Sequence, residues 1–245
     1  MKLTGMAVAL EEQVSSNACQ DMTFEERLGL LVDREMTERT NRQIAIRLRL
    51  SKLRQSACIE DVDFRHARSL DRPLLMELSG CAWIGRHDNC LMTGPTGVGK
   101  TFLACALANK ACREGYKVLY ERTSRLLEAL AVAHADGTYS RRLAAIARYD
   151  LLVLDDWGLA PLTLEQCRDL LEVFEDRYDR RSTLVTSQLP VQDWHKLLPD
   201  PTLADAALDR LVHNSHRIEL TGDSMRKTRG RSGMAVVQED GRAHA

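Results

Sequence analysis

Eight consecutive residues match the pattern G-x-x-x-x-G-K-[ST] at every fixed position: Gly94, Pro95, Thr96, Gly97, Val98, Gly99, Lys100 and Thr101. Glycines let a backbone bend around phosphate groups with its N–H groups pointing inward. In such a loop the lysine reaches the β- and γ-phosphates, and the threonine hydroxyl can hold Mg²⁺. We therefore expect residues 94–101 to bind a nucleoside triphosphate, with Lys100 in a catalytic role and Thr101 as a Mg²⁺ ligand.

The segments on either side of this loop are the ones that phosphate binding requires. Residues 89–93 form a short apolar run typical of a buried strand, and residues 100–114 have helical spacing of small and apolar side chains. A strand before the loop and a helix after it place a helix N-terminus against the bound anion. This context makes a chance glycine-rich turn a poor alternative.

A pair of acids ends a second apolar run further along the chain. Residues 150–156 read Asp-Leu-Leu-Val-Leu-Asp-Asp, which is the Walker B form of a buried strand that ends in carboxylates. The carboxyl ends of parallel strands face the same crevice as the phosphate loop. We therefore expect Asp155 beside Mg²⁺ and Asp156 beside the attacking water.

Polar residues also end the apolar run at 182–188. If this strand lies between the phosphate-loop strand and the Walker B strand, Ser187 or Gln188 faces the γ-phosphate. An amide such as Gln188 can position a water because it donates and accepts hydrogen bonds together. The alternative is an ordinary strand-end turn before Pro190.

A single arginine, Arg210, stands in the helical segment 205–211. A lone arginine on a helix usually belongs to a solvated face. If subunits pack head to tail, Arg210 could instead enter the ATP site of the neighbouring subunit and stabilise charge in the transition state.

Apolar runs and helical stretches alternate after residue 80. Strands are expected at 89–93, 117–121, 150–154, 183–187 and 216–220, and helices at 100–114, 123–134, 140–148, 163–180 and 203–213. This alternation predicts an α/β fold with a parallel sheet and helices on both faces. We expect an all-helical N-terminal domain at 1–79, an ATPase core at 80–227 and a disordered tail at 228–245.

The overall composition fits a cytoplasmic protein that does not enter a membrane. The formal net charge is −1, so any nucleic-acid contact must be a local patch. No apolar stretch reaches the length of about 18 residues that a membrane helix needs. The seven cysteines include no C-x-x-C pair, and several lie in apolar runs, so they indicate small buried hydrophobic residues.

Two local basic clusters are candidate contacts to DNA. The first lies between residues 34 and 54 and includes Arg39, Arg42, Arg47, Arg49, Lys52 and Arg54, and the second, within 124–148, includes Arg141 and Arg142. A charge run is usually a solvated helix face. Since few aromatic residues accompany these clusters, contact with the backbone of duplex DNA is favoured over stacking on single strands, and strong sequence preference is not indicated.

Taken together in their order and spacing, these motifs resemble the IstB-like ATP-binding proteins, which are helper ATPases of bacterial insertion sequences in the AAA+ clade of DnaC and DnaA. The resemblance extends from about residue 20 to 228 and includes Trp157-Gly158 after the acids and Asp209-Arg210-Leu211. The second Walker B acid is more often Glu in such ATPases, and Asp156 is one methylene shorter. The 35 residues after Arg210 are too few for the separate helical lid of larger AAA+ proteins, so no full C-terminal lid is expected.

The resemblance implies ATP and Mg²⁺ as ligands and a role in transposition. It implies an ATPase that assembles on target DNA as a head-to-tail homo-oligomer, a ring or a helix, and recruits or activates its cognate transposase. The principal alternative is a DnaC-like loader of the replicative helicase. A small-molecule kinase with a phosphate loop is disfavoured, because it would leave Arg210 and the basic N-terminal residues without a role.

Lys100 provides the first test. Lys100→Ala should weaken nucleotide affinity and abolish ATP-dependent assembly, because it removes the cation that the β- and γ-phosphates contact. Titration with a fluorescent ATP analogue measures the first effect and light scattering the second. Parental nucleotide affinity in this variant would refute the assignment of the loop.

Overall fold

The computed structural model describes residues 2–16, 19, 21–65 and 68–225. The chain divides into two compact units, Met1–Leu50 and Ser51–Ala245. This division falls well before residue 80, where the sequence predicts the ATPase core to begin. Residues 51–79 belong to the second unit because their helices η2 (Ile59–Asp61) and α3 (Arg72–Ser79) pack on α5 (Lys100–Arg113). The expected tail at 228–245, and any lid after residue 225, lie outside the described residues.

The described residues of the first unit include two α-helices, α1 (Thr4–Ser15) and α2 (Phe24–Ser51). The buried carboxylate of Glu35 on α2 accepts hydrogen bonds from the backbone amides of Gly5 (2.8 Å) and Met6 (3.2 Å) in the first turn of α1. Arg39 pairs with the same carboxylate at 2.7 Å and is the main cause that lowers the pKa of Glu35. An anion at a helix N-terminus is favourable, so Glu35 holds the start of α1 against α2.

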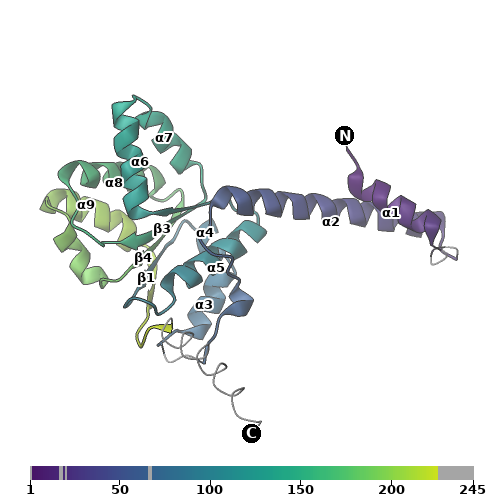
Figure 1. Ribbon diagram of the computed structural model, residues 1–245, viewed down its shortest axis with the longest axis horizontal. Coiled ribbons are helices and arrows are strands. Elements are labelled where there is room, and N and C mark those ends of the chain that lie inside the picture. The colour runs from purple at the N-terminus through teal and green to yellow at the C-terminus, as the bar shows by residue number, and fades with distance from the viewer. Residues whose placement is uncertain (1, 17–18, 20, 66–67, 226–245) are drawn as a thin grey trace, which may run out of the picture. The chain divides into compact units, whose positions relative to one another are not determined.

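The second unit contains the sheet. Among the described residues, five parallel strands lie in the order β2-β3-β4-β1-β5 (Figure 1). They are β1 (Asn89–Thr93), β2 (Val118–Arg122), β3 (Leu151–Trp157), β4 (Ser182–Ser187) and β5 (Ser215–Glu219). The expected parallel α/β fold is confirmed, and each strand lies within a few residues of its expected position. β4 lies between β1 and β3, as the argument about Gln188 requires.

Helices cover both faces of the sheet (Figure 1). α5 packs against one face, together with α3 and the short α4 (Ala82–Gly85). The other face carries the remaining elements, which are α6 (Thr123–Ala135), α7 (Tyr139–Ala147), α8 (Leu164–Arg177), η3 (Val191–Leu197) and α9 (Pro201–Val212). The ranges of α5, α6, α7, α8 and α9 agree within a few residues with those expected from helical spacing.

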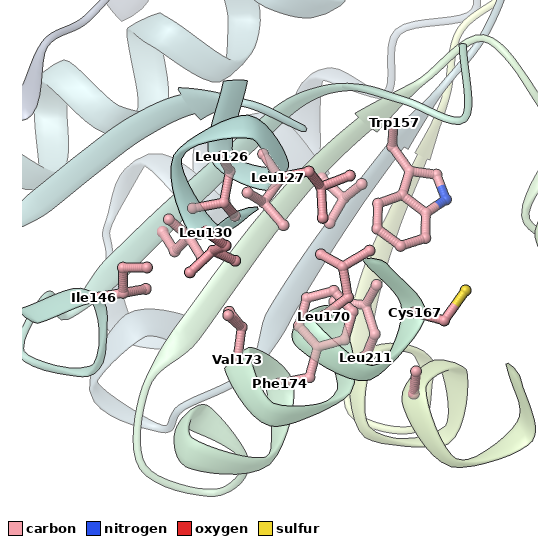
Figure 2. Close-up of a cluster of buried hydrophobic side chains, with 14 of the residues drawn as sticks. Leu126, Leu127, Leu130, Ile146, Trp157, Cys167, Leu170, Val173, Phe174 and Leu211 are labelled. Carbon is pink, nitrogen blue, oxygen red and sulfur yellow. The ribbon is translucent and has the colours of Figure 1, made fainter. Parts of the chain in front are cut away.

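The main apolar core lies between the sheet and the α6–α9 layer (Figure 2). Its members include Leu126, Leu130, Ile146, Leu170, Phe174 and Leu211, with Leu152 and Leu154 from β3. Successive side chains of a strand point to opposite faces. Since Leu152 and Leu154 point into this core, Asp155 points to the opposite face, where α5 and the phosphate loop lie.

The cysteines behave as the sequence predicts. All seven are free, and five of them are buried: Cys81, Cys90, Cys105, Cys112 and Cys167. Burial raises the pKa of the Cys90 thiol to about 12, so this thiol stays protonated. In the part of the chain that the structure describes, no helix has both the length and the apolar character needed to cross a membrane.

Arg177, at the end of α8, connects its own helix to the segment between α7 and β3 and to the start of β4. Its guanidinium is buried and donates to the carbonyl oxygens of Ile146 (3.1 Å), Tyr149 (2.9 Å) and Ser182, and to the Thr183 hydroxyl (3.2 Å). Burial lowers its pKa to about 9. The cation therefore satisfies buried acceptors where α7 leads into β3 and where β4 begins.

Replacing Arg177 should destabilise the second unit strongly. Arg177→Met keeps much of the side-chain volume but leaves the buried acceptors unpaired, so the free energy of unfolding should fall by about 2–4 kcal/mol. Urea unfolding followed by circular dichroism measures the change. Arg180→Met, in the exposed turn that follows, serves as a control and should unfold like the parent. Equal unfolding free energies for the two variants would contradict this role of Arg177.

Candidate nucleotide-binding site

The phosphate loop has a backbone that glycine alone adopts easily. Gly94, Gly97 and Gly99 have φ values of 144°, 89° and 98°, in the region that other L-residues rarely enter. A Cβ atom at Gly94 would lie 2.3 Å from the Leu220 carbonyl oxygen, and one at Gly97 would lie 2.0 Å from the Ser224 hydroxyl. The loop joins the end of β1 to the N-terminus of α5, so that the helix begins at Lys100.

Lys100 is held inside this loop. Its ammonium group donates hydrogen bonds to the carbonyl oxygens of Gly94 (2.6 Å) and Pro95 (2.8 Å), and the residue is 8% exposed. Charge-assisted hydrogen bonds to phosphate are stronger than those to neutral carbonyl groups. Lys100 is therefore placed to exchange these carbonyl partners for phosphate oxygens, which fits the role that the motif predicts.

Asp155 is a fully buried carboxylate at the centre of the site. It accepts hydrogen bonds from the hydroxyl of Thr101 (3.0 and 3.1 Å), the phenol of Tyr120 and the hydroxyl of Thr186. Burial and this carboxylate together raise the pKa of Tyr120, so the phenol remains a donor. A buried carboxylate is tolerated only with such partners. The contact between Asp155 and Thr101 joins the two expected Mg²⁺ ligands.

Asp156 occupies a β-bulge that turns its side chain toward the same pocket. The pairing of β3 with β4 shifts register between Leu154 and Trp157, and Asp156 has a φ of 61°. A bulge can re-aim a side chain in this way. Aspartate enters the left-handed region much more readily than most residues. This conformation explains why a shorter acid than Glu suits the position.

Two arginines stand close to these acids. Arg54 Nη1 lies 3.7 Å from Asp155 Oδ2 and 3.8 Å from Asp156 Oδ2. Arg122 Nε lies 3.8 Å from the same oxygen of Asp156. Sequence reasoning assigned Arg54 to DNA contact alone and missed Arg122. The available signal was the pairing of strands, because Arg122 ends β2 directly beside Asp155 on β3.

The two polar residues at the end of β4, Ser187 and Gln188, have different surroundings. Gln188 lines the nucleotide pocket and accepts a hydrogen bond from the Thr96 hydroxyl of the phosphate loop at 2.7 Å. Ser187 is buried, donates to the Trp157 carbonyl oxygen and accepts from the Leu189 amide. Gln188 and Ser187 were the two candidates for positioning the water. Of these two, Gln188 lines the pocket and Ser187 does not.

A pocket opens over the phosphate loop. The loop, Lys100 and Thr101 form one wall. The rest of the lining consists of Gln55, Asp61, Asp63, Arg68, Phe102 and Met225. Sequence reasoning missed the part at residues 55–68, which no motif marks because it is distant in sequence from the phosphate loop.

Arg68 fastens this part of the lining to the phosphate loop. It is buried, and its guanidinium donates to the carbonyl oxygens of Val98 (3.2 Å) and Asp63 (2.9 Å). Burial lowers its pKa. A Cβ atom at Gly99 would lie 2.7 Å from Arg68 Nη1, so the last glycine of the motif also makes room for this arginine.

Arg210 lies at the opposite ends of the strands from the phosphate loop, beside the start of β1. It pairs with Glu175 of α8 and donates to the Ala206 carbonyl oxygen at 2.8 Å. The Asn89 side chain, at the start of β1, donates to the Arg210 carbonyl oxygen at 3.2 Å. Since the phosphate loop follows the end of β1, the length of this strand, about 17 Å, separates Arg210 from the loop of its own chain. Arg210 is therefore not brought together with the other predicted catalytic residues within one chain.

The predicted DNA contacts are spread over both units. Arg39, Arg42, Arg47 and Arg49 lie on α2, and Arg42 donates to the Thr4 hydroxyl at 2.8 Å. In the second unit, Lys52 and Arg142 each pair with Glu121, at 3.6 and 3.8 Å, and Arg141 precedes Arg142 on α7. Lys52, Arg54, Tyr120, Glu121, Arg122 and Arg125 line a second depression, which we call the basic groove.

The residues of the pocket fit ATP with Mg²⁺. The inward-bent loop and the N-terminus of α5 suit an anionic triphosphate. The Thr101 hydroxyl and the Asp155 carboxylate lie next to each other and are hard oxygen ligands. Mg²⁺ is commonly bound by one or two carboxylates together with substrate phosphates. Thr101 and Asp155 would hold the ion, which would supply charge neutralisation at the phosphate oxygens.

Comparisons with known proteins agree with this geometry. The family described as IstB-like ATP binding protein matches residues 1–233. The insertion-sequence ATP-binding protein y4pL of Sinorhizobium fredii is 53% identical over 231 residues, 94% of each chain. The solved structure of DnaI superposes with a TM-score of 0.59 at 22% identity, covering 68% of this chain and 92% of DnaI. AMPPCP-bound DnaA from Aquifex aeolicus gives 0.59 at 20% identity, covering 78% and 58%.

The parallel sheet, the phosphate loop and the two acids near the end of β3 define a nucleotide-binding core of the P-loop class, with a helical N-terminal region, and its fold resembles that of DnaI and DnaA. The chain belongs to the IstB-like ATP-binding proteins. The resemblance that the sequence motifs indicate is thereby confirmed, and with it ATP as the nucleotide of the family. The roles of individual site residues stay predictions.

The bulge at Asp156 yields a prediction with two substitutions. Asp156→Asn keeps a residue that tolerates positive φ but removes the charge, so the variant should fold and bind ATP while hydrolysis falls on the order of 10²-fold. Asp156→Glu keeps the charge but strains the backbone, so its free energy of unfolding should fall by about 1 kcal/mol. Phosphate release and urea unfolding measure these effects. Parental hydrolysis by Asp156→Asn would contradict the role of the carboxylate.

Proposed function

We propose that this chain is an ATP-hydrolysing helper of a transposase, which assembles on target DNA and recruits or activates the transposase. The observation that carries the ATPase part is the contact of Thr101 with Asp155 beneath a complete phosphate loop. The transposition part is supported by family membership and by the insertion-sequence name of a relative that spans almost the whole chain.

In this proposal five residues of the site have defined tasks in hydrolysis. Lys100 contacts the β- and γ-phosphates, and Asp155 with Thr101 holds Mg²⁺. Asp156 and Gln188 orient the attacking water. The water oxygen bonds to the γ-phosphorus as the bond from that phosphorus to the bridging oxygen breaks. ADP keeps the bonding electrons, and the water proton passes through Asp156 to solvent.

Arg210 would act on the pocket of a neighbouring subunit. Its position at the amino edge of the sheet, away from its own phosphate loop, supports this role. An arginine that acts in trans requires a head-to-tail interface, and repeated interfaces of this kind form rings or open helices. The pair with Glu175 would then be exchanged for phosphate oxygens on assembly, which makes ATP the link between subunits.

The basic groove is the DNA contact that the second unit supports best. It gathers four cationic side chains around one acid, and Glu121 is already paired with Lys52 and Arg142. α6 begins at this groove without a side-chain cap and without an acid in its first turn, which leaves its N–H groups available to a phosphate. Contacts of this kind read the backbone, so duplex DNA would bind without strong sequence preference.

Loading of a replicative helicase is the alternative function. DnaI and DnaA share the fold, but at 22% and 20% identity they indicate the fold alone. The insertion-sequence relative at 53% identity favours transposition. Affinity capture with any transposase that a neighbouring gene encodes, against capture with the replicative helicase of the host, distinguishes the two functions.

The proposed function is tested by assembly and turnover together. With ATP, Mg²⁺ and duplex DNA, light scattering should show oligomers, and hydrolysis should proceed without any small phosphate acceptor. A protein that stays monomeric under these conditions would contradict the proposal. Binding to DNA should weaken steeply with salt, with a slope of log affinity on log salt close to −0.9 per phosphate contact.

Arg210 provides a sharper prediction. Arg210→Ala should bind ATP as the parent does, because the residue lies away from its own pocket, while hydrolysis in the assembled protein falls on the order of 10³-fold. Arg168→Ala, an exposed arginine on α8, removes the same charge elsewhere and should hydrolyse normally. ATP titration and phosphate release make the two measurements. Parental turnover by Arg210→Ala would refute action in trans.

A further inference from the structure

One residue of β4 stands opposite both acids of β3. The register of the two strands shifts between Leu154 and Trp157. Within this shift β3 has two residues, Asp155 and Asp156, whereas β4 has one, Thr186. The extra residue of a bulge is left outside the regular ladder of backbone hydrogen bonds. Thr186 is therefore the residue of β4 that can serve both acids.

The hydroxyl of Thr186 bonds to both acids at once. It donates to Oδ1 of Asp155 and accepts from the backbone N–H of Asp156 at 3.2 Å. A hydroxyl has one hydrogen to donate and lone pairs to accept with, so the two bonds do not compete. Thr186 is 1% exposed, and the branched side chain of threonine restricts its χ1 torsion. The hydroxyl is therefore fixed in place and shielded from water.

The orientation of the Asp155 carboxylate depends on bonds of this kind. The χ2 torsion of an aspartate has a broad energy minimum, so hydrogen bonds must select one orientation. Thr186 on β4 donates to Oδ1, and Tyr120 on β2 donates to Oδ2. The two strands that flank β3 thus each supply a hydroxyl to a different oxygen, and together they set the plane of the carboxylate.

We propose that Thr186 is a positioning residue for both acids of the hydrolytic site. Its donated bond sets the orientation in which Asp155 meets Mg²⁺, and its accepted bond holds the bulge that aims Asp156 at the attacking water. Thr186 does not itself line the nucleotide pocket, so it acts through the two acids. This inference rests on the proposed function, which assigns Mg²⁺ to Asp155 and the attacking water to Asp156.

The experiment compares Thr186→Val, which keeps the shape of the side chain without the hydroxyl, with Thr186→Ser, which keeps the hydroxyl. A fluorescent ATP analogue measures nucleotide affinity in EDTA and across a titration with Mg²⁺. In Thr186→Val the Mg²⁺ concentration at half-maximal effect should rise on the order of 10-fold, as is usual when a partner of a metal-binding group is lost. Affinity in EDTA should stay parental, because Thr186 lies outside the pocket. Thr186→Ser should stay within about 2-fold of the parent in both measurements.

Two further measurements report on Asp156. At saturating Mg²⁺, phosphate release by Thr186→Val should remain on the order of 10-fold slower than the parent, because the bulge is no longer held. Hydrogen exchange followed by mass spectrometry should show the backbone amide of Asp156 exchanging on the order of 10-fold faster in this variant. The exchange measurement needs neither nucleotide nor metal, so it tests the bulge independently of turnover.

Thr183→Val is the matched control. Thr183 is another buried threonine of β4, and its hydroxyl accepts a hydrogen bond from Arg177 at the opposite end of the strand. The same substitution there should lower stability in urea unfolding but leave the Mg²⁺ requirement, the turnover and the exchange of the Asp156 amide unchanged. If Thr186→Val does not fold, Thr186→Cys replaces it, since a thiol is a weak donor and a weak acceptor. Its Mg²⁺ requirement should exceed that of Thr186→Ser.

The outcomes separate this inference from the proposed function. If the parent hydrolyses no ATP in the presence of Mg²⁺, the proposed function fails. If the parent is active but Thr186→Val keeps its Mg²⁺ requirement, turnover and amide exchange, the positioning role is refuted alone. The role is refuted equally if Thr186→Ser loses as much as Thr186→Val, or if Thr183→Val shows the same changes.

Discussion

A buried negative charge organises the nucleotide-binding end of the sheet. Asp155 has no access to solvent, and an isolated carboxylate would be strongly destabilising there. Its partners come from three neighbouring elements, with Tyr120 on β2, Thr186 on β4 and Thr101 at the start of α5. The need to satisfy this charge therefore fixes the phosphate loop relative to the sheet. In the proposed function the same carboxylate holds Mg²⁺ together with Thr101, so one interaction stabilises the fold and prepares the site.

The two edges of the sheet have different tasks. The carboxyl edge carries the loop, both acids and Gln188, whereas the amino edge carries Arg210, which Asn89 and Glu175 hold in place. A parallel sheet puts these groups a full strand length apart, so one chain cannot bring its own Arg210 to its own pocket. On this account the site is complete only between two subunits. ATP and DNA then act on the same assembly from two sides, through the interface and through the basic groove.

Much of the fold and part of the site could be predicted from the sequence. The loop at 94–101, the acids at 155 and 156 and the alternation of strands and helices are local patterns whose spacing has a physical cause. Arg122, Arg68 and the pocket wall at 55–68 could not be predicted this way, since their roles come from contacts between distant segments. The bulge at Asp156 was also invisible, because register depends on the neighbouring strand. The boundary expected near residue 79 differs from the division at residue 50 for the same reason: residues 51–79 pack on α5, which no local pattern records.

Mixing two inactive variants tests most directly whether the site is shared. Asp156→Asn supplies an intact Arg210 without a working pocket, and Arg210→Ala supplies an intact pocket without the arginine. Each variant alone should hydrolyse ATP slowly. An equimolar mixture assembled at random should recover about one quarter of the parental rate, since that share of head-to-tail interfaces combines an intact pocket with an intact arginine. A mixture that hydrolyses ATP no faster than the average of its two components would contradict the account.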